Sequence, residues 1–266
     1  MRTISFIIYL LTACFLVISS CNKRAESKEK EVITIAAAAN MQFAIQALAD
    51  SFAKEHRLEY NLVISSSGKL TAQIKEGAPY DIFVSANMKY PKEIDSIGKA
   101  ATTPKVYAYG KLVLWSMMEN ISPSIEALTG NKVNHIALAN PATAPYGKAA
   151  TESLEKTELT EKVKGKLVFG ESIAQTNQFI TSKSAELGFT ALSVVLSPEM
   201  KGKGKWTQVP DSLYTPLEQG VIIVKQDKTV RPEVLRFYQY LFSTDAKKIL
   251  KAFGYAVNES TIRTHH

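Results

Sequence analysis

The stretch Ile33-Thr34-Ile35-Ala36-Ala37-Ala38-Ala39-Asn40-Met41 decides the fold of this chain. It begins as a β-branched strand, passes through four alanines and reaches Asn40, a residue type that favours the N-cap of a helix. Apolar side chains then recur at helical spacing, which predicts an amphipathic helix, at Met41, Ile45, Leu48 and Phe52. A strand, a turn of small residues and the free N–H groups of a helix N-terminus can hold an anion without a charged side chain. Taken alone, the stretch is equally consistent with an ordinary strand-to-helix turn that binds no ligand.

A second stretch repeats this pattern. Residues 60–64 predict a strand, Ser65-Ser66-Ser67-Gly68 forms a turn of small residues, and 69–76 predicts a helix. Comparable turns lie near Tyr146 and Ile173. Alternating strands and helices are typical of parallel βαβ units, and ligands of such sheets lie beyond the carboxyl ends of the strands. We therefore expect two turns from each of two domains to face each other across a cleft.

The remaining elements are expected at positions that a structure can check directly. Further strands are predicted over 81–85, 106–115, 135–139, 166–169, 187–191 and 217–224, the last of which returns the chain to the first domain. Further helices are predicted over 148–154, 173–182, 232–241 and 244–252. We also expect Asn87 to cap a helix that runs through Ile94 and Ile97, and Ser122-Pro123 to begin a short helix.

The composition is that of a globular protein with one large or two modest domains. The chain has 266 residues and a formal net charge of +7 at pH 7. Its basic residues are scattered and form no long block, which argues against nucleic-acid binding. A positive surface would still speed the arrival of an anion.

The N-terminus has the features of an export signal. Arg2 supplies positive charge, and the apolar run over 4–18 is shorter than the ~20 residues of a membrane-spanning helix. Ile18-Ser19-Ser20-Cys21 resembles the lipobox of bacterial lipoproteins, which implies cleavage before Cys21 and acylation of this residue. A plain secretory signal is the alternative. The other cysteine, Cys14, lies within the signal, so we expect no disulfide and no cysteine-based metal site.

Catalytic and metal-binding patterns are missing from the sequence. The four histidines have no metal-ligand spacing, and there is no HExxH, GxSxG or GxGxxG motif. We expect His135 at the edge of a strand. An exported enzyme that uses Ser67 with Asp81 or Glu171 is the least favoured alternative, because no base for the serine is evident. Asp81 is instead expected to open a strand and Glu171 to precede a helix N-terminus, so we expect neither catalysis nor a cofactor.

Several motifs, taken in order, resemble the periplasmic molybdate-binding proteins of ABC transporters, the ModA family. They span residues 31–257, and the strongest are Ser65-Ser66-Ser67-Gly68-Lys69-Leu70 and Gly77-Ala78-Pro79-Tyr80-Asp81-Ile82-Phe83. The resemblance implies an α/β protein with the two-domain, type II periplasmic-binding-protein fold. Each domain would be a mostly parallel sheet flanked by helices, with the ligand in the interdomain cleft.

The resemblance also implies which residues contact a molybdate or tungstate oxyanion. The first turn contributes Asn40, with the backbone N–H of Ala39, and the second turn contributes the Ser67 hydroxyl. In the second domain the contacts fall on the backbone N–H and the hydroxyl of Tyr146 and on the backbone N–H of Ile173. Molybdenum would be bound only as its oxyanion, with no direct protein ligand to the metal.

One position departs from the family pattern. Some members have a tyrosine hydroxyl where this chain has Ala191, so we expect the Tyr146 hydroxyl to replace it. A tetrahedral dianion requires many N–H and O–H donors in a dry site. Phosphate often carries a proton near pH 7 that such a site leaves unpaired, at a cost of about 1–3 kcal/mol. Sulfate has the same charge as molybdate and differs in size, so a binding lipoprotein of this fold for sulfate or another oxyanion is the main alternative.

These inferences give a domain organisation. We expect a lipoprotein signal peptide at 1–20, a flexible tether at 21–31, domain I at 32–111 and 219–258, domain II at 112–218 and a tail at 259–266. The tether is charged and lacks an apolar period. As the resemblance implies, the protein would be a monomeric periplasmic or extracytoplasmic lipoprotein, anchored to the membrane at Cys21. It would deliver its ligand to an ABC permease after a hinge closes the two domains.

Overall fold

The structure of the protein is a computed structural model that describes residues 32–226 and 229–258. The predicted signal peptide, the tether with Cys21 and the C-terminal tail lie outside the described residues. Within those residues the chain forms two five-stranded sheets.

The first sheet has the strand order β2-β1-β3-β10-β4. Its strands are β1 (Val32–Ala38), β2 (Glu59–Ser65), β3 (Ile82–Ser85), β4 (Lys105–Gly110) and β10 (Leu217–Ile223). β1 is parallel to both β2 and β3, whereas β10 is antiparallel to its neighbours β3 and β4. The strand that comes last in the sequence therefore lies inside this sheet, as predicted for residues 217–224.

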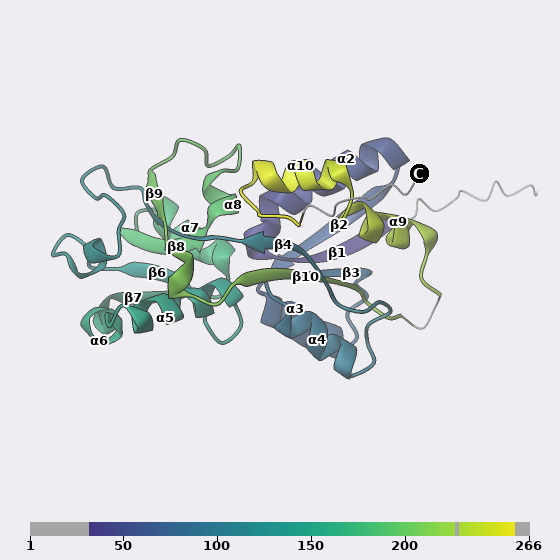
Figure 1. Cartoon of the computed structure of the whole chain (residues 1–266), viewed down its shortest axis with the longest axis horizontal. Helices are drawn as coiled ribbons and strands as arrows, with labels where there is room; N and C mark the ends of the chain where they lie inside the picture. Colours follow the sequence, from purple (N-terminus) through teal and green to yellow (C-terminus); the bar gives the residue numbers. More distant parts are fainter. Residues whose placement is uncertain (1–31, 227–228, 259–266) are drawn as a thin grey trace, which may run out of the picture. The chain divides into compact units, whose positions relative to one another are not determined.

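Helices cover both faces of the first sheet (Figure 1). One face carries α2 (Gln42–His56), α9 (Pro232–Tyr240) and α10 (Thr244–Ala252), and the other carries α3 (Ser67–Lys75) and α4 (Lys89–Ser96). Alternate side chains of β1 pack into the hydrophobic cores on the two faces of the sheet, because successive residues of a strand point to opposite faces. Ile33 and Ile35 pack with α2, whereas Ala36 packs with α3.

The second sheet has the order β7-β6-β8-β5-β9. Its strands are β5 (Leu112–Ser116), β6 (Ile136–Ala139), β7 (Leu167–Gly170), β8 (Leu187–Ala191) and β9 (Lys205–Gln208). The helices of this half are α5 (Pro145–Lys156), α6 (Thr160–Val163), α7 (Ile173–Thr181) and α8 (Leu192–Val195). Short 3-10 turns are η3 (Glu126–Thr129), η4 (Lys164–Lys166) and η5 (Asp211–Leu213).

The two sheets share one arrangement of strands. In each, the strand next to one edge is parallel to both of its neighbours, and the remaining two pairings are antiparallel. These second strands are β1 and β6. Such a strand is a topological switch point, beyond whose carboxyl end ligands of open α/β sheets bind. Both sheets are therefore mixed, and not mostly parallel as predicted.

Three predicted details of the helices are wrong. Asn40 does not cap a helix, because it lies inside a 3-10 turn, η2 (Ala39–Met41), that leads into α2. Asn87 does not cap α4, whose N-cap is Met88. Ser122-Pro123 does not begin a helix, since the turn η3 starts at Glu126, where the Ser124 hydroxyl accepts from the backbone N–H of Ala127.

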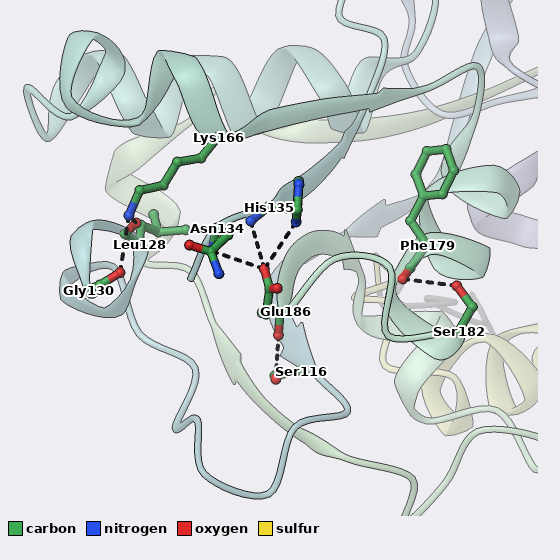
Figure 2. A network of polar contacts seen from close by, with 9 residues as sticks. All are labelled: Ser116, Leu128, Gly130, Asn134, His135, Lys166, Phe179, Ser182 and Glu186. Atoms are coloured by element: carbon green, nitrogen blue, oxygen red, sulfur yellow. Dashed lines mark hydrogen bonds and ion pairs between the residues drawn. The ribbon is translucent and has the colours of Figure 1, made fainter. Parts of the chain in front are cut away.

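A partly buried carboxylate organises the loops at one end of the second sheet (Figure 2). Glu186 accepts hydrogen bonds from the backbone N–H groups of Asn134, at 3.0 Å, and His135, at 2.7 Å. Its own carbonyl accepts from the Ser116 hydroxyl at 2.6 Å. His135 precedes β6 and remains half-exposed, close to its predicted place at a strand edge.

The described residues include no helix long and apolar enough to cross a bilayer. Over the same ranges, no group of three or more histidine, cysteine, aspartate or glutamate side chains is placed to hold a metal ion.

Candidate functional site

Four helix N-termini follow the carboxyl ends of β1, β2, β6 and β7, which are the edge strand and its parallel neighbour in each sheet. They belong to η2, α3, α5 and α7. The first N–H groups of any helix lack partners within the helix, and a side chain at the N-cap often satisfies one of them. Only α3 has such a cap, from Ser66, whereas Ala38, Ala144 and Ser172 provide no side-chain hydrogen bond to theirs. Three of these helix ends therefore retain unsatisfied donors.

These helix ends line one small cavity. Its walls are formed by Ala38, Ala39, Asn40, Ser66, Ser67, Ala86, Ala144, Pro145, Tyr146 and Ile173. No charged side chain stands among these described residues. About 10 Å³ of the cavity is open to the centre of a water molecule, which is the room that one bound water needs. An oxyanion is larger than water, so the two halves must part slightly to admit one.

All five residues predicted to bind the ligand line this cavity: Ala39, Asn40, Ser67, Tyr146 and Ile173. Each is at least nine-tenths buried. Ala39, Asn40 and Ser67 come from the first half of the structure, on η2 and α3. Tyr146 and Ile173 come from the second half, on α5 and α7. Ala191 is buried at the end of β8 opposite Leu112 and is not among the lining residues.

The Ser67 hydroxyl is oriented by the backbone. Its oxygen accepts a hydrogen bond from the N–H of Ala86 at 3.0 Å. Because the oxygen is engaged as an acceptor, the hydroxyl proton remains to be donated, and the described residues offer it no acceptor. Ser67 is fully buried at the first position of α3. This serine is thus prepared to donate a hydrogen bond into the cavity.

The Asn40 side chain does not donate a hydrogen bond into the cavity. Its amide nitrogen donates to Gln219 Oε1 at 2.8 Å and to the Tyr255 hydroxyl at 3.0 Å. Its carbonyl oxygen on the main chain accepts from Ser193 Oγ at 2.7 Å. Both side-chain amide protons of Asn40 are therefore used within the protein. The donor that remains available to a ligand is the backbone N–H of Asn40, in the first turn.

Tyr146 occupies the second position of α5, after Pro145, and is buried. The helix starts three residues earlier than predicted, which brings the Tyr146 N–H into its first turn. The hydroxyl lies near Asn40 and Tyr255 but is not aligned for a hydrogen bond with any described residue. Burial, followed by the neighbouring tyrosine hydroxyls, raises the pKa of Tyr146 well above its ordinary value, so the phenol keeps its proton.

A glycine lets the α5 N-terminus approach its strand. A Cβ on Gly147 would stand 2.0 Å from the carbonyl oxygen of Ala139, the last residue of β6. Any side chain at this position would push the first turn of α5 away from the strand end. Gly147 therefore contributes to the position of the Tyr146 N–H.

The two halves meet beside the cavity through hydrogen bonds to backbone carbonyl groups. The N–H of Gly68 on α3 donates to the carbonyl oxygen of Thr143 at 2.9 Å, and the Tyr90 hydroxyl donates to the carbonyl of Ala142 at 3.3 Å. Lys69 and Glu171 also form an ion pair between the halves, with both side chains about half exposed. Exposed pairs contribute little energy, so the backbone contacts define this closed arrangement.

Sequence reasoning missed the polar residues behind the cavity. Gln219, Tyr255 and Ser193 are buried and bonded to Asn40. The only signal for Gln219 was a polar side chain within an apolar strand, and Ser193 and Tyr255 have no distinguishing pattern around them.

A family model described as "Bacterial extracellular solute-binding protein" matches residues 33–256. The chain belongs to this family. Membership places this solute-binding protein outside the cytoplasm, as the export signal predicts.

Two relatives with names and one solved structure are similar to this solute-binding protein over most of its length. It is 36% identical over 227 residues to the molybdate-binding protein ModA of Azotobacter vinelandii, covering 85% of this chain and 90% of the relative. It is 30% identical over 259 residues to YvgL of Bacillus subtilis, named as a candidate ABC transporter substrate-binding lipoprotein, covering 94% and 97%. The solved periplasmic molybdate-binding protein of A. vinelandii matches with a TM-score of 0.80 and 32% identity, over 85% of this chain and all of that one. The predicted family and the type II binding-protein fold are confirmed.

Proposed function

We propose that this protein captures molybdate or tungstate in the cavity and delivers it to an ABC permease. The observation that carries the proposal is the meeting of four helix N-termini, three of them uncapped, around one buried space without a charged side chain. Helix N-termini attract anions through their free N–H groups and the helix dipole. The names of the Azotobacter relatives agree with this ligand class.

The proposed contacts follow from the donors in the cavity. The backbone N–H groups of Ala39 and Asn40 and the Ser67 hydroxyl hold the ion from one side. The backbone N–H groups of Tyr146 and Ile173 hold it from the other, and the Tyr146 hydroxyl adds a further donor. Hydrogen bonds to a charged acceptor are stronger than neutral ones, so several such donors can replace the water that a dianion loses on entering.

Binding rather than catalysis is the function that we infer for Ser67. Asp81 accepts from the Thr34 N–H at 2.8 Å and pairs with Arg231 at 2.9 Å, so its carboxylate is already engaged. Glu171 pairs with Lys69 at the surface. Neither carboxylate is in place as a base for the Ser67 hydroxyl.

Calorimetry on the purified protein tests the ligand. We expect heat with sodium molybdate and sodium tungstate, and weak or no binding of sulfate and phosphate. Phosphate tests hydrogen bonding, because its extra proton needs an acceptor, whereas sulfate tests the size of the cavity. If sulfate binds more tightly than molybdate, the same fold serves another oxyanion. If none of the four ions binds to folded, ligand-free protein, the proposal is wrong.

We further propose that the protein is a monomeric lipoprotein, acylated at Cys21 and tethered by residues 21–31. The sequence Ile18-Ser19-Ser20-Cys21 and the description of the B. subtilis relative support this. Cys21→Ala should move the protein from the membrane fraction to the soluble fraction, and mass spectrometry of the wild-type N-terminus should find lipid on Cys21. A soluble wild-type protein without lipid would mean a plain secretory signal.

The predicted domain boundaries are retained as part of the proposal. Domain I would comprise 32–111 and 219–258, and domain II would comprise 112–218. The division of the strands between two sheets supports it, because the chain leaves the first sheet after Gly110 and returns at Leu217. Hinge motion at these two crossings would open the cavity for the ion and close it for recognition by the permease.

A further inference from the structure

Gln219 occupies an unusual place in β10. The pairing of β10 with β4 shifts register between Gln219 and Gly220, as in a β-bulge. Bulges redirect side chains and are common beside functional sites. Gln219 is fully buried, although it lies close to the point at which the chain returns from the second sheet to the first.

The hydrogen bonds of Gln219 determine which way its amide faces. Its nitrogen donates to the carbonyl oxygens of Ala86, at 3.1 Å, and Leu217, at 2.8 Å. Carbonyl oxygens can only accept, so the nitrogen must face them and Oε1 must face Asn40. Asn40 must then present its NH₂ group to Gln219, which leaves its second amide proton for the Tyr255 hydroxyl.

The remaining protons of this network can be placed in the same way. The Ser193 hydroxyl donates to the carbonyl oxygen of Asn40 at 2.7 Å. The Tyr255 hydroxyl, which receives the Asn40 amide proton, lies 3.0 Å from Ser193 Oγ and 3.1 Å from the Asn40 carbonyl, so its proton has an acceptor. Buried polar networks specify one arrangement when every member is satisfied.

Gln219 connects both ligand turns of the first half of the structure. Through its Oε1 it holds Asn40 on η2. Through its nitrogen it holds the carbonyl of Ala86, the residue whose N–H orients the Ser67 hydroxyl at 3.0 Å. A single side chain on the returning strand therefore fixes two ligand turns that are 27 positions apart in the sequence, at 40 and 67.

We propose that Gln219 and Tyr255 are positioning residues for the ligand. By occupying both amide protons of Asn40, they keep its side chain turned away and leave the backbone N–H groups of the first turn to the ion. This inference rests on the proposed oxyanion function. It goes beyond that function by assigning the orientation of the donors to two residues that do not line the cavity.

The sharpest test replaces the Gln219 amide by a carboxylic acid of the same shape. In Gln219→Glu, the protonated acid can still donate to a carbonyl and accept from Asn40, whereas the ionised acid can only accept. Burial disfavours the ionised form and so raises the pKa of such a group. We expect the affinity for sodium molybdate, measured by calorimetry, to approach that of wild type near pH 6 and to fall by up to tenfold per pH unit toward pH 8.

The surroundings of Gln219 make this pH profile interpretable. The hydroxyls of Tyr146 and Tyr255 interact with Asn40, and that of Tyr107 interacts with Tyr255; burial is the main cause that raises the pKa of all three tyrosines. All three stay neutral between pH 6 and pH 8, and molybdate keeps its double negative charge. Wild type and Gln239→Glu, which adds the same charge at an exposed site on α9, should therefore show a flat profile.

A pair of tyrosine variants provides the second test. Tyr255→Phe removes a hydroxyl of the network and should weaken molybdate binding about tenfold. Tyr107→Phe removes an equally buried hydroxyl that has no hydrogen-bond partner among the described residues, and should change the affinity less than twofold. Equal affinities for the two variants, or a flat pH profile for Gln219→Glu, would overturn the inference while leaving the proposed function intact.

A measurement without ligand separates this inference from the proposed function. In wild type, NMR should find slowly exchanging side-chain NH₂ protons of Asn40, identified by their loss in Asn40→Asp, and Tyr255→Phe should make them exchange faster. If wild type fails to bind any oxyanion but these protons are protected, the function is wrong and the network is real. If they exchange freely in wild type, Asn40 is not held and the inference is wrong.

Discussion

The backbone N–H of Ala86 donates to the Ser67 hydroxyl oxygen at 3.0 Å, which leaves the hydroxyl proton free for the cavity. The bond joins the residue after β3 to the first residue of α3. It converts a serine that could rotate freely into a donor of fixed direction. Donors that are oriented before the ligand arrives need no reorganisation when it binds.

Ser67→Ala should therefore weaken molybdate binding by about 1–3 kcal/mol, the range for a lost charge-assisted hydrogen bond. Calorimetry measures the loss, and the melting temperature of ligand-free protein reports any damage from the unpaired Ala86 N–H. Thr71→Val is the matched control, because it removes the hydroxyl that donates to the Ser67 carbonyl at 2.8 Å without removing the proposed donor. Wild-type affinity in Ser67→Ala would reject this hydroxyl as a ligand donor.

Gly68→Ala should separate ligand binding from folding. A Cβ at this position would lie 2.9 Å from Thr143 Cα and 2.9 Å from the Tyr90 hydroxyl oxygen, so it would obstruct the closed contact. Overpacking of this kind costs about 1–3 kcal/mol, and we expect the affinity to fall by that amount. Alanine is a better helix former than glycine, so the open, ligand-free protein should melt no lower than wild type.

Gly165→Ala is the control for this substitution. A Cβ on Gly165 meets nothing within 4 Å, so binding should not change. Small-angle scattering should find that Gly68→Ala compacts less than wild type when molybdate is added. Full compaction and unchanged affinity would show that closure tolerates a methyl group at the Gly68–Thr143 contact.

Tyr146→Phe should weaken molybdate binding by about 1–3 kcal/mol if the hydroxyl donates to the ion. A buried hydroxyl without a partner calls for an explanation, and a bound oxyanion is an acceptor that would provide it. The raised pKa of Tyr146 keeps the donor protonated over the physiological range. Calorimetry with the phenylalanine variant tests whether the hydroxyl contacts the ion. Unchanged affinity would mean that Tyr146 contributes to binding only through its backbone N–H.

Glu186 should stabilise the second half of the protein in a manner that depends on pH. Burial acts to raise the pKa of this carboxyl, but the backbone N–H groups of His135, Glu186 and Asn134 outweigh it, and the net effect lowers the pKa below its ordinary 4.5. A group with a lowered pKa stabilises the fold fully above its unfolded-state value, and the effect is lost as the pH falls through the folded-state value.

Glu186→Ala should accordingly lower the free energy of unfolding at pH 7 by about 1–3 kcal/mol. The difference from wild type should shrink when the pH is lowered to about 3. Urea unfolding followed by circular dichroism measures both values, with the exposed Glu199→Ala as a control. An equal difference at the two pH values would mean that the contribution of Glu186 does not depend on its charge.

The strands and the long helices could be predicted because each has a strong local pattern. Residues 187–191 and 244–252 were predicted to the residue, from an apolar run and an amphipathic stripe. The cavity walls could be predicted because small-residue turns at Asn40 and Ser67 follow apolar strands. The resemblance to a known family indicated which of these turns would contact the ligand.

Other features depend on contacts that no local pattern records. β9 is exposed along its whole length, so it shows no alternation, and α6 and α8 are four residues each. The role of the Asn40 side chain could not be predicted, because the partners that turn it, Gln219 and Tyr255, lie 179 and 215 positions away. Local capping rules predict that the side-chain oxygen of Asn40 accepts a hydrogen bond from the first turn of the helix. In the structure its side-chain NH₂ group instead donates to these two distant residues.

The position of β10 in the first sheet constrains the order in which the protein can be assembled. All strands of the second sheet lie between residues 112 and 208, so this sheet is complete before the last fifth of the chain has emerged from the ribosome or the export channel. The first sheet must wait for β10, which inserts between β3 and β4. A chain cut short before Leu217 would keep a finished second half and leave two unpaired strand edges in the first, where premature association between chains would begin.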